Sequence, residues 1–246
     1  GLRYTRDEVY SEVTNFYGRG GTDILEIDSN KMTGRLAYEQ DINDATLAYA
    51  SYTRGFKPGG SNLTFGREDV VSPIVVLPTF EEETIDAYEV GLKTDLDGGR
   101  IRINTAAFMY AYDNLQYQAT DPEVFQGGVG NIPKSEIYGA ELEFGAFLTD
   151  SLLFDARLAW LKTEITSSHL ALDNVQSEAA TNALLAQGVS LFSEEVEIAR
   201  AAEIEDIKGN ELPKTPSLTG NIALTHTASM NGFGELKTSL SLTYRG

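Results

Sequence analysis

The sequence predicts an all-β protein, an antiparallel meander that forms part of a transmembrane β-barrel and has about nine strands. Three observations lead to this fold class. Apolar and polar residues alternate with a period of two along many segments. Short polar turns alternate with long connections, whereas the connections of a β-sandwich are more even in length. Several alternating segments are longer than the about 9 to 11 residues that a tilted strand needs to cross a bilayer.

The first strands follow from this alternation. Residues 2–12 predict an opening strand, and residues 31–40 predict a strand with two distinct faces. The polar segment at residues 41–44 predicts a tight turn into a further strand over residues 45–56. Three more hairpins repeat this plan. Their strands cover residues 84–95 and 100–117, 135–147 and 154–160, and 216–227 and 236–244, with turns at residues 97–99, 149–151 and 229–232.

Three long segments connect these hairpins, at residues 57–80, 120–133 and 166–213. We interpret the glycine-rich residues 127–130 as flexible loop, because no helix follows that could direct backbone amides at a phosphate. Because short turns and long loops alternate, the long segments should share one end of the sheet. Loops at one mouth of a rigid scaffold commonly carry recognition.

The longest loop predicts one short helix. Ser193 fits an N-cap followed by an acidic first turn, and residues 209–210, Gly-Asn, supply a stop signal. An apolar face at helical spacing is expected to rest on the rim of the barrel, and a lid that closes over a ligand is the alternative. The members of this face are Val196, Ala199, Glu203 and Ile207.

Composition limits the possible functions. The 246 residues contain 19 basic and 37 acidic side chains, a net charge of -18 that disfavours nucleic acid as a partner. There is no cysteine, which excludes disulfides, thiolate metal sites and cysteine nucleophiles. No apolar run approaches the roughly 18 residues of a transmembrane helix. The mean hydropathy of -0.22 is compatible with barrel strands, because only one of their faces is apolar. Residues 1–7 lack the features of a secretory signal, so either an export signal precedes them or the protein is not exported.

Four segments carry a family resemblance. Residues 49–60, Tyr-Ala-Ser-Tyr-Thr-Arg-Gly-Phe-Lys-Pro-Gly-Gly, resemble the strand-to-loop signature of TonB-dependent receptors. Residues 88–93 (Tyr-Glu-Val-Gly-Leu-Lys), 138–143 (Tyr-Gly-Ala-Glu-Leu-Glu) and 212–216 (Leu-Pro-Lys-Thr-Pro) match the same family in the expected order.

The resemblance implies a barrel of about 22 strands, closed by an N-terminal plug domain and coupled through the plug to the TonB complex. It also implies localisation in the bacterial outer membrane. Nine strands are too few to close such a barrel, and open strand edges cannot lie in lipid. We therefore expect residues 1–246 to be a partial barrel domain that lacks the plug and the C-terminal strands.

Few side chains suggest a specific site. Arg54 and Lys57, at the outer end of the signature, are the candidates for positions near the ligand entrance. The carboxylates at residues 81–83 and Asp86 are expected to form a solvated charged rim rather than a cation site. Residues 95–98 resemble the start of a calcium loop, but position 106 is alanine where the loop would need a glutamate, so we expect a hairpin turn.

The two histidines, His169 and His226, lie far apart in the sequence and are expected at the surface without a metal. No nucleophile elbow, phosphate-binding loop or zinc-protease motif is present, so we predict neither an enzyme nor a cofactor.

Two groups of side chains fit the two faces of a barrel. Aromatic residues on one face could form interfacial girdles, although ordinary sheet packing uses the same residue types. Charged residues on the other face are expected to line the lumen and to pair between strands. The proposed girdle consists of Tyr88, Tyr138, Trp160 and Tyr244, and the lumen set of Arg35, Glu39, Lys93, Arg102, Glu141, Glu143 and Arg157.

Three functions remain open. The first is active import of a scarce nutrient by a gated receptor, with an iron–siderophore complex as the leading substrate from the resemblance and vitamin, sugar or haem as rivals. The second is a passive outer-membrane porin. The third is a soluble or surface-attached β-sheet binding module, in which a second sheet instead of lipid would cover the aromatic face.

Overall fold

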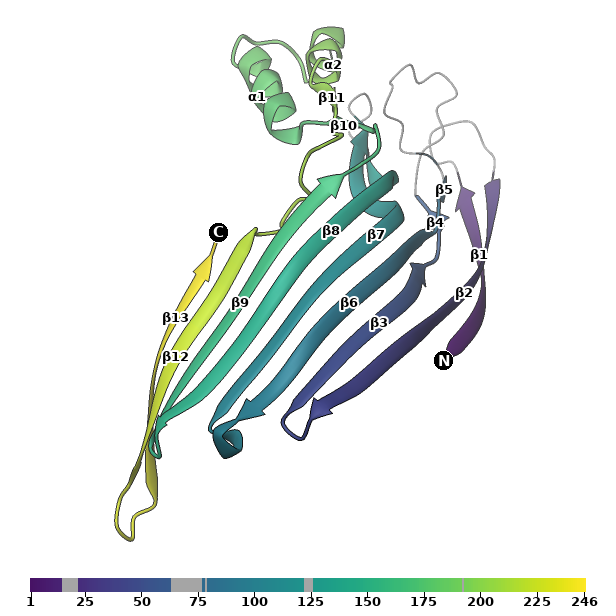
Figure 1. Ribbon diagram of the computed structural model, residues 1–246. Coiled ribbons are helices and arrows are strands. Elements are labelled where there is room, and N and C mark those ends of the chain that lie inside the picture. Colours follow the sequence, from purple (N-terminus) through teal and green to yellow (C-terminus); the bar gives the residue numbers. More distant parts are fainter. Residues whose placement is uncertain (15–21, 63–76, 78, 122–125, 192) are drawn as a thin grey trace.

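The computed structural model describes residues 1–14, 22–62, 77, 79–121, 126–191 and 193–246 (Figure 1). Within these residues, nine strands form one antiparallel sheet in which every strand lies beside its predecessor along the meander. The predicted number of strands and the meander are therefore confirmed. In sheet order the strands are β1 (Leu2–Thr14), β2 (Thr22–Asn43), β3 (Thr46–Lys57), β6 (Glu83–Leu96), β7 (Ile101–Asp121), β8 (Gln126–Thr149), β9 (Leu152–Ile165), β12 (Leu218–Ser229) and β13 (Glu235–Arg245).

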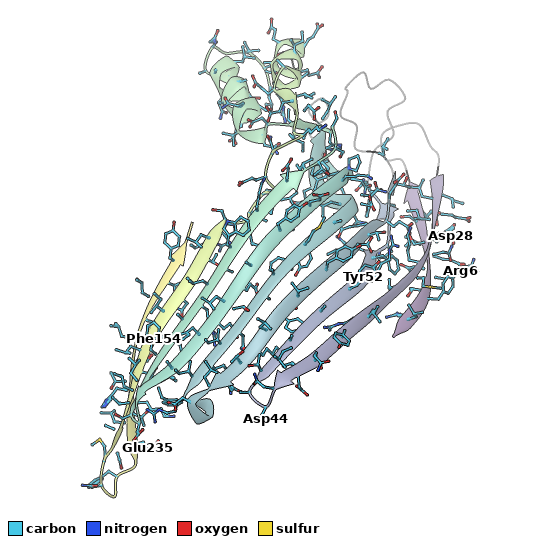
Figure 2. All side chains as sticks on the ribbon, viewed as in Figure 1. Arg6, Asp28, Asp44, Tyr52, Phe154 and Glu235 are labelled. Carbon is cyan, nitrogen blue, oxygen red and sulfur yellow. The ribbon has the colours of Figure 1, made fainter. Side chains whose placement is uncertain are left out.

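Tight turns occupy one end of this sheet, at the bottom of Figure 1. The β6–β7 turn is a short 3-10 segment, η1 (Asp97–Gly99), whose Gly98 and Gly99 have φ of 64° and 90°. These left-handed conformations favour glycine, so the Asp-Gly-Gly sequence forms the predicted hairpin turn. Asp44 and Glu235 lie at the same end of the sheet (Figure 2). The described parts of the long connections at residues 57–80 and 166–213 lie at the opposite end (Figure 1), as the alternation predicts.

One predicted loop is instead strand. Residues 120–133 were expected to form a long connection, but β7 and β8 continue to Asp121 and from Gln126 in regular antiparallel register. The glycine-rich residues 127–130 therefore belong to β8. A backbone ladder tolerates glycine where a neighbouring ring fills the missing side-chain volume, and a Cβ at Gly130 would lie 3.0 Å from the Tyr117 ring.

The two faces of the sheet differ as the alternation predicts. Cross-strand partners lie on the same face, so the register from Tyr52 through Tyr88 and Met109 to Tyr138 defines one continuous outer face. This face carries exposed apolar side chains, and the four predicted girdle aromatics belong to it. Large side chains exposed on the outer face include Leu36, Tyr38, Tyr88, Val90, Leu92, Tyr138, Leu158, Trp160, Leu240, Leu242 and Tyr244.

The inner face carries the predicted lumen charges and several aromatic rings. Glu143 lies opposite Arg157 with an N···O distance of 3.9 Å, and it accepts a hydrogen bond of 3.1 Å from Asn104. Lys93 lies 5.4 Å above the ring of Tyr49. This face is polar, which is the arrangement expected for the lumen side of a barrel wall.

A small apolar cluster lies at the end of the sheet that carries the long connections. Ile132, Ile165 and Leu212 are buried there, with Tyr117 and Ile207 among the partly buried side chains that pack against them. Since Leu212 and Ile207 both come from the C-terminal part of the longest connection, the cluster fixes that part of the connection to the strand ends.

The longest connection folds into a small unit of two short strands and two helices (Figure 1). One helix was predicted and two are present, so that prediction is incomplete. In the described part of the chain, no helix is both long and apolar enough to cross a membrane. In chain order the unit contains β10 (Leu170–Leu172), α1 (Asn174–Leu185), α2 (Glu194–Ala201) and β11 (Ile204–Asp206).

The predicted helix is α2, and it begins after Ser193 as expected. It ends at Ala201 instead of reaching the stop signal at residues 209–210. The four residues predicted to rest together on the rim do not share one contact surface. Val196 is fully buried on α2, which packs against α1. Of the four, Ile207 packs against the apolar cluster at the strand ends.

Candidate ligand-entrance site

A short segment crosses the inner face at the end of the sheet opposite the tight turns. We call it the strap and define it as residues 58–62, 77 and 79–82. Its two strands, β4 (Gly60–Ser61) and β5 (Thr79–Phe80), pair with each other in antiparallel register. Figure 1 shows the strap beside the upper ends of β1 to β3.

One side of the strap contacts β1 and β2. The Ser61 hydroxyl donates a hydrogen bond of 2.8 Å to the hydroxyl of Ser11, and the Gly59 amide approaches the buried Ser29 hydroxyl at 3.4 Å. Lys31 forms an ion pair of 2.5 Å with Glu82. All three partners on β1 and β2 lie on the inner face in the strand register.

The other side of the strap is held by Asn62. Its side-chain amide donates to the carbonyls of Val129 at 2.8 Å and Leu77 at 2.9 Å, and its oxygen accepts from the Val129 amide at 2.8 Å. Asn62 is only 6% exposed. An asparagine buried in this way satisfies a backbone donor and two backbone acceptors at once, and it fixes the strap to β8.

Glu81 is held by three side-chain amides. Gln116 donates to the carbonyls of Pro58 and Glu81 at 2.9 and 3.0 Å, and Asn131 both donates to the Glu81 carbonyl at 3.0 Å and accepts from its amide at 2.8 Å. Asn114 donates to the Glu81 carboxylate at 2.7 Å. In the sheet order β3 and β6 separate β2 from β7, so the strap joins strands that are not neighbours and crosses the inner face between them.

A cavity of about 320 Å³ lies between the strap, the upper ends of β7 and β8, and the start of the long connection. We call it the mouth cavity. A second recess of about 520 Å³ adjoins it and includes Glu26, Asp28 and Glu82. Both are lined by Thr79, Phe80, Glu81 and Asn114. The residues specific to the mouth cavity are Leu77, Tyr117, Ala119, Val129, Gly130, Asn131, Pro133, His169 and Leu170.

His169 is a site residue that the sequence analysis placed at the surface. It is half-buried, and its Nε2 lies 2.8 Å from the Tyr117 hydroxyl, with the two rings edge to face. Burial lowers the pKa of His169, and the nearby Asp206 carboxylate opposes this effect. The imidazole is therefore neutral at pH 7. No pattern around His169 indicated this contact, because Tyr117 is 52 residues away along the chain.

Asp206 fixes the backbone around His169. Its carboxylate accepts hydrogen bonds from the Ser168 hydroxyl at 2.7 Å and from the amides of His169 and Lys208, both at 3.0 Å. These bonds lower the pKa of Asp206. The start and end of the long connection are thereby joined beside the mouth cavity. His226, in contrast, is exposed on the outer face, as predicted.

The two predicted entrance residues lie on different faces. Lys57 ends β3 on the inner-face register and lies opposite Glu83. Arg54 lies on the outer-face register, where its guanidinium is 3.4 Å from Asp86. The Tyr52 hydroxyl donates to the same carboxylate at 2.6 Å. Figure 2 shows Tyr52 toward the end of the sheet that carries the long connections.

The carboxylates predicted to form a solvated rim have individual protein partners instead. Glu82 forms an ion pair with Lys31, and Asp86 forms one with Arg54. Glu83 accepts a hydrogen bond of 2.7 Å from the backbone amide of Gln116. Among the described residues, no three His, Asp or Glu side chains converge in a way that could hold a metal ion. Of these three carboxylates only Glu82 belongs to the strap, and its ion pair with Lys31 attaches the strap to β2, whereas Glu83 and Asp86 belong to β6.

Comparison with known proteins gives one family over the full sequence. Residues 1–246 match the family described as TonB dependent receptor-like, beta-barrel. Solved structures agree with this match. The ferric yersiniabactin uptake receptor FyuA from Yersinia pestis aligns with 100% of this chain at 17% identity and a TM-score of 0.66, and the siderophore receptor PiuA from Acinetobacter baumannii aligns with 99% at 17% identity and a TM-score of 0.63.

A copper transporter, OprC, also aligns with 92% of the chain at 14% identity and a TM-score of 0.55. At these identities the likeness shows the fold alone. The chain spans 30% of the length of the first two receptors and 29% of the copper transporter.

Proposed function

Because the chain belongs to the TonB-dependent receptor β-barrel family, we propose that it is part of an outer-membrane receptor that actively imports a scarce nutrient. The leading substrate is an iron–siderophore complex. The family and the fold are those of transport receptors rather than enzymes. The observation that carries the proposal is a sheet with one apolar and one polar face that matches the receptor barrels along its whole length.

Residues 1–246 would form a single partial barrel domain. Its apolar outer face would contact membrane lipid, and its polar inner face would surround a plug domain through which the TonB complex acts. Among the described strands, β1 and β13 each leave one edge of the sheet unpaired, which supports this assignment because backbone groups within a bilayer require partners.

The end of the sheet with the long connections would face the cell exterior, and the strap with the mouth cavity would lie at the ligand entrance. Lys57 reaches this end on the inner-face register and remains the candidate for contact with an incoming ligand. Arg54, on the outer-face register, would lie at the membrane boundary, where its guanidinium pairs with Asp86.

Two other functions make different predictions. A porin would admit solutes passively according to size and charge, without TonB. A soluble sheet module would cover the outer aromatic face with protein and would not need detergent. The strap favours a receptor over an open pore, because it crosses the inner face between β1 and β8 at the end of the sheet that carries the long connections.

Uptake of radioactive iron tests the proposal. The full-length receptor would be expressed in Gram-negative cells that lack their own siderophore receptors, with and without TonB, and supplied with a panel of ferric chelates. We expect saturable uptake of at least one chelate that disappears without TonB. Non-saturable uptake in the absence of TonB would support the porin, and extraction of the protein without detergent would support the soluble module.

A further inference from the structure

We propose that the mouth cavity binds a positively charged, amine-type group of the ligand and discriminates against anionic groups. The inference rests on the proposed function for its role in transport, but the binding itself does not depend on transport. It is carried by the chemistry of the described residues that line the cavity.

The described lining residues carry charge of one sign. Among the described lining residues, Glu81 is the one carboxylate, burial lowers the pKa of His169, and none is Lys or Arg. Glu26 and Asp28, which also border the adjoining recess, lie on the outer-face register of β2 and add no carboxylate to the cavity. Lys31, which touches this region, is paired with Glu82. Glu81 is therefore the charged group that a ligand would meet in the mouth cavity, and its carboxylate favours a cationic group over an anionic one.

The rings in the cavity have fixed positions. Phe80 lies against Gly60, where a Cβ would come within 2.4 Å of the ring, so glycine is required for this approach. Tyr117 is held through its hydroxyl by His169 at 2.8 Å. Aromatic faces attract ammonium groups, and two fixed rings next to one carboxylate are the elements of an organic-cation site.

The carboxylate of Glu81 is also oriented before any ligand arrives. Asn114 donates to Oε2 at 2.7 Å, and the Glu81 backbone is held by Asn131 and Gln116. A group that is already fixed loses little conformational entropy on binding. With a volume of about 320 Å³ the cavity is at the lower end of the range for small-molecule sites, so it suits one cationic moiety of a larger chelate.

Ligand-observed fluorine NMR on the purified full-length receptor tests this inference. The probes are 4-fluorobenzyltrimethylammonium, neutral 4-fluorobenzyl alcohol and anionic 4-fluorobenzoate. We expect the cation to bind about tenfold more tightly than either of the other probes, the ratio that corresponds to one carboxylate and one ring contact. Glu81→Gln keeps an oxygen for Asn114 but removes the charge, and it should reduce this preference to about twofold.

Two further variants make the result specific. Phe80→Leu should weaken binding of the cation more than binding of the alcohol, since it removes a ring of the cavity. Glu235→Gln, an exposed carboxylate at the opposite end of the sheet, should leave all three affinities unchanged. Equal or tighter binding of the anion, a preference that survives Glu81→Gln, or no binding of the cation at millimolar concentration would overturn the inference.

The result is separable from the proposed function. TonB-dependent uptake of a ferric chelate together with no cation binding would refute the cavity assignment alone. Cation binding without TonB-dependent uptake of any chelate would refute the transport proposal alone.

Discussion

Replacing Asn62 with alanine should release the strap from the wall. The substitution removes three hydrogen bonds, two donated by the amide and one accepted by its oxygen. Each contributes about 1 kcal/mol net, and Asn62 is only 6% exposed, so water replaces them poorly. The free energy of opening this contact should therefore fall by about 3 kcal/mol, which corresponds to an opening equilibrium on the order of 100-fold larger.

Hydrogen exchange measured by mass spectrometry on the detergent-solubilised receptor reports this opening. Exchange of the Val129 amide, read in peptides that cover residues 127–131 of β8, should accelerate on the order of 100-fold, because this amide loses its acceptor. The matched control is Asn221→Ala, whose amide bonds to the Leu242 carbonyl and the Thr243 hydroxyl are exposed. That variant should leave exchange in residues 127–131 unchanged. Wild-type exchange rates at Val129 in Asn62→Ala would refute the role assigned to this contact.

Three further predictions address other parts of the molecule. Ala107→Arg on the outer face should lower the free energy of unfolding in lipid by about 2 to 4 kcal/mol, whereas Ala106→Arg on the inner face should cost less, and equal costs would contradict the assignment of the faces. Because the pKa of His169 is lowered in the folded protein, docking of residues 166–172 should be strongest above about pH 6.5 and should weaken below it. Hydrogen exchange in these residues should therefore rise on acidification, and the rise should be absent in His169→Gln. Gly139→Val should lower the free energy of unfolding by about 1 to 3 kcal/mol, because a Cβ there would lie 2.2 Å from the Phe108 ring, and an unchanged denaturation midpoint would refute this packing.

Much of the sheet could be predicted from the sequence, because successive side chains of a strand point to opposite faces and the apolar residues therefore recur at every second position. The hairpin at residues 97–99 was predictable for a related reason, since Asp-Gly-Gly allows the left-handed conformations that the turn requires. The extension of β8 through residues 127–130 was missed because glycine has no side chain to show an alternation. There the pairing with β7 and the ring of Tyr117 decide the structure.

The entrance site was less predictable, since its residues meet only through the fold. Asn62 and Val129 are 67 residues apart, and the contact between Tyr117 and His169 spans 52. Helix α1 was missed for a local reason, because its buried residues are Ser177 and Thr181 and it therefore shows no apolar stripe. Arg54 and Lys57 were chosen by position in a motif, which does not reveal that they lie on different faces.

The most direct test of the central claim, that this sheet is a membrane-spanning wall with a lipid face and a lumen face, is a spin-label scan of β8. The chain has no native cysteine, so single cysteines can be placed at positions 138–146 of the full-length receptor in bilayers. We predict that oxygen accessibility peaks at the even positions, which include Leu142, and that accessibility to a water-soluble nickel reagent peaks at the odd positions, which include Glu143. Accessibilities to both reagents that rise and fall together, or that show no period of two, would contradict the account.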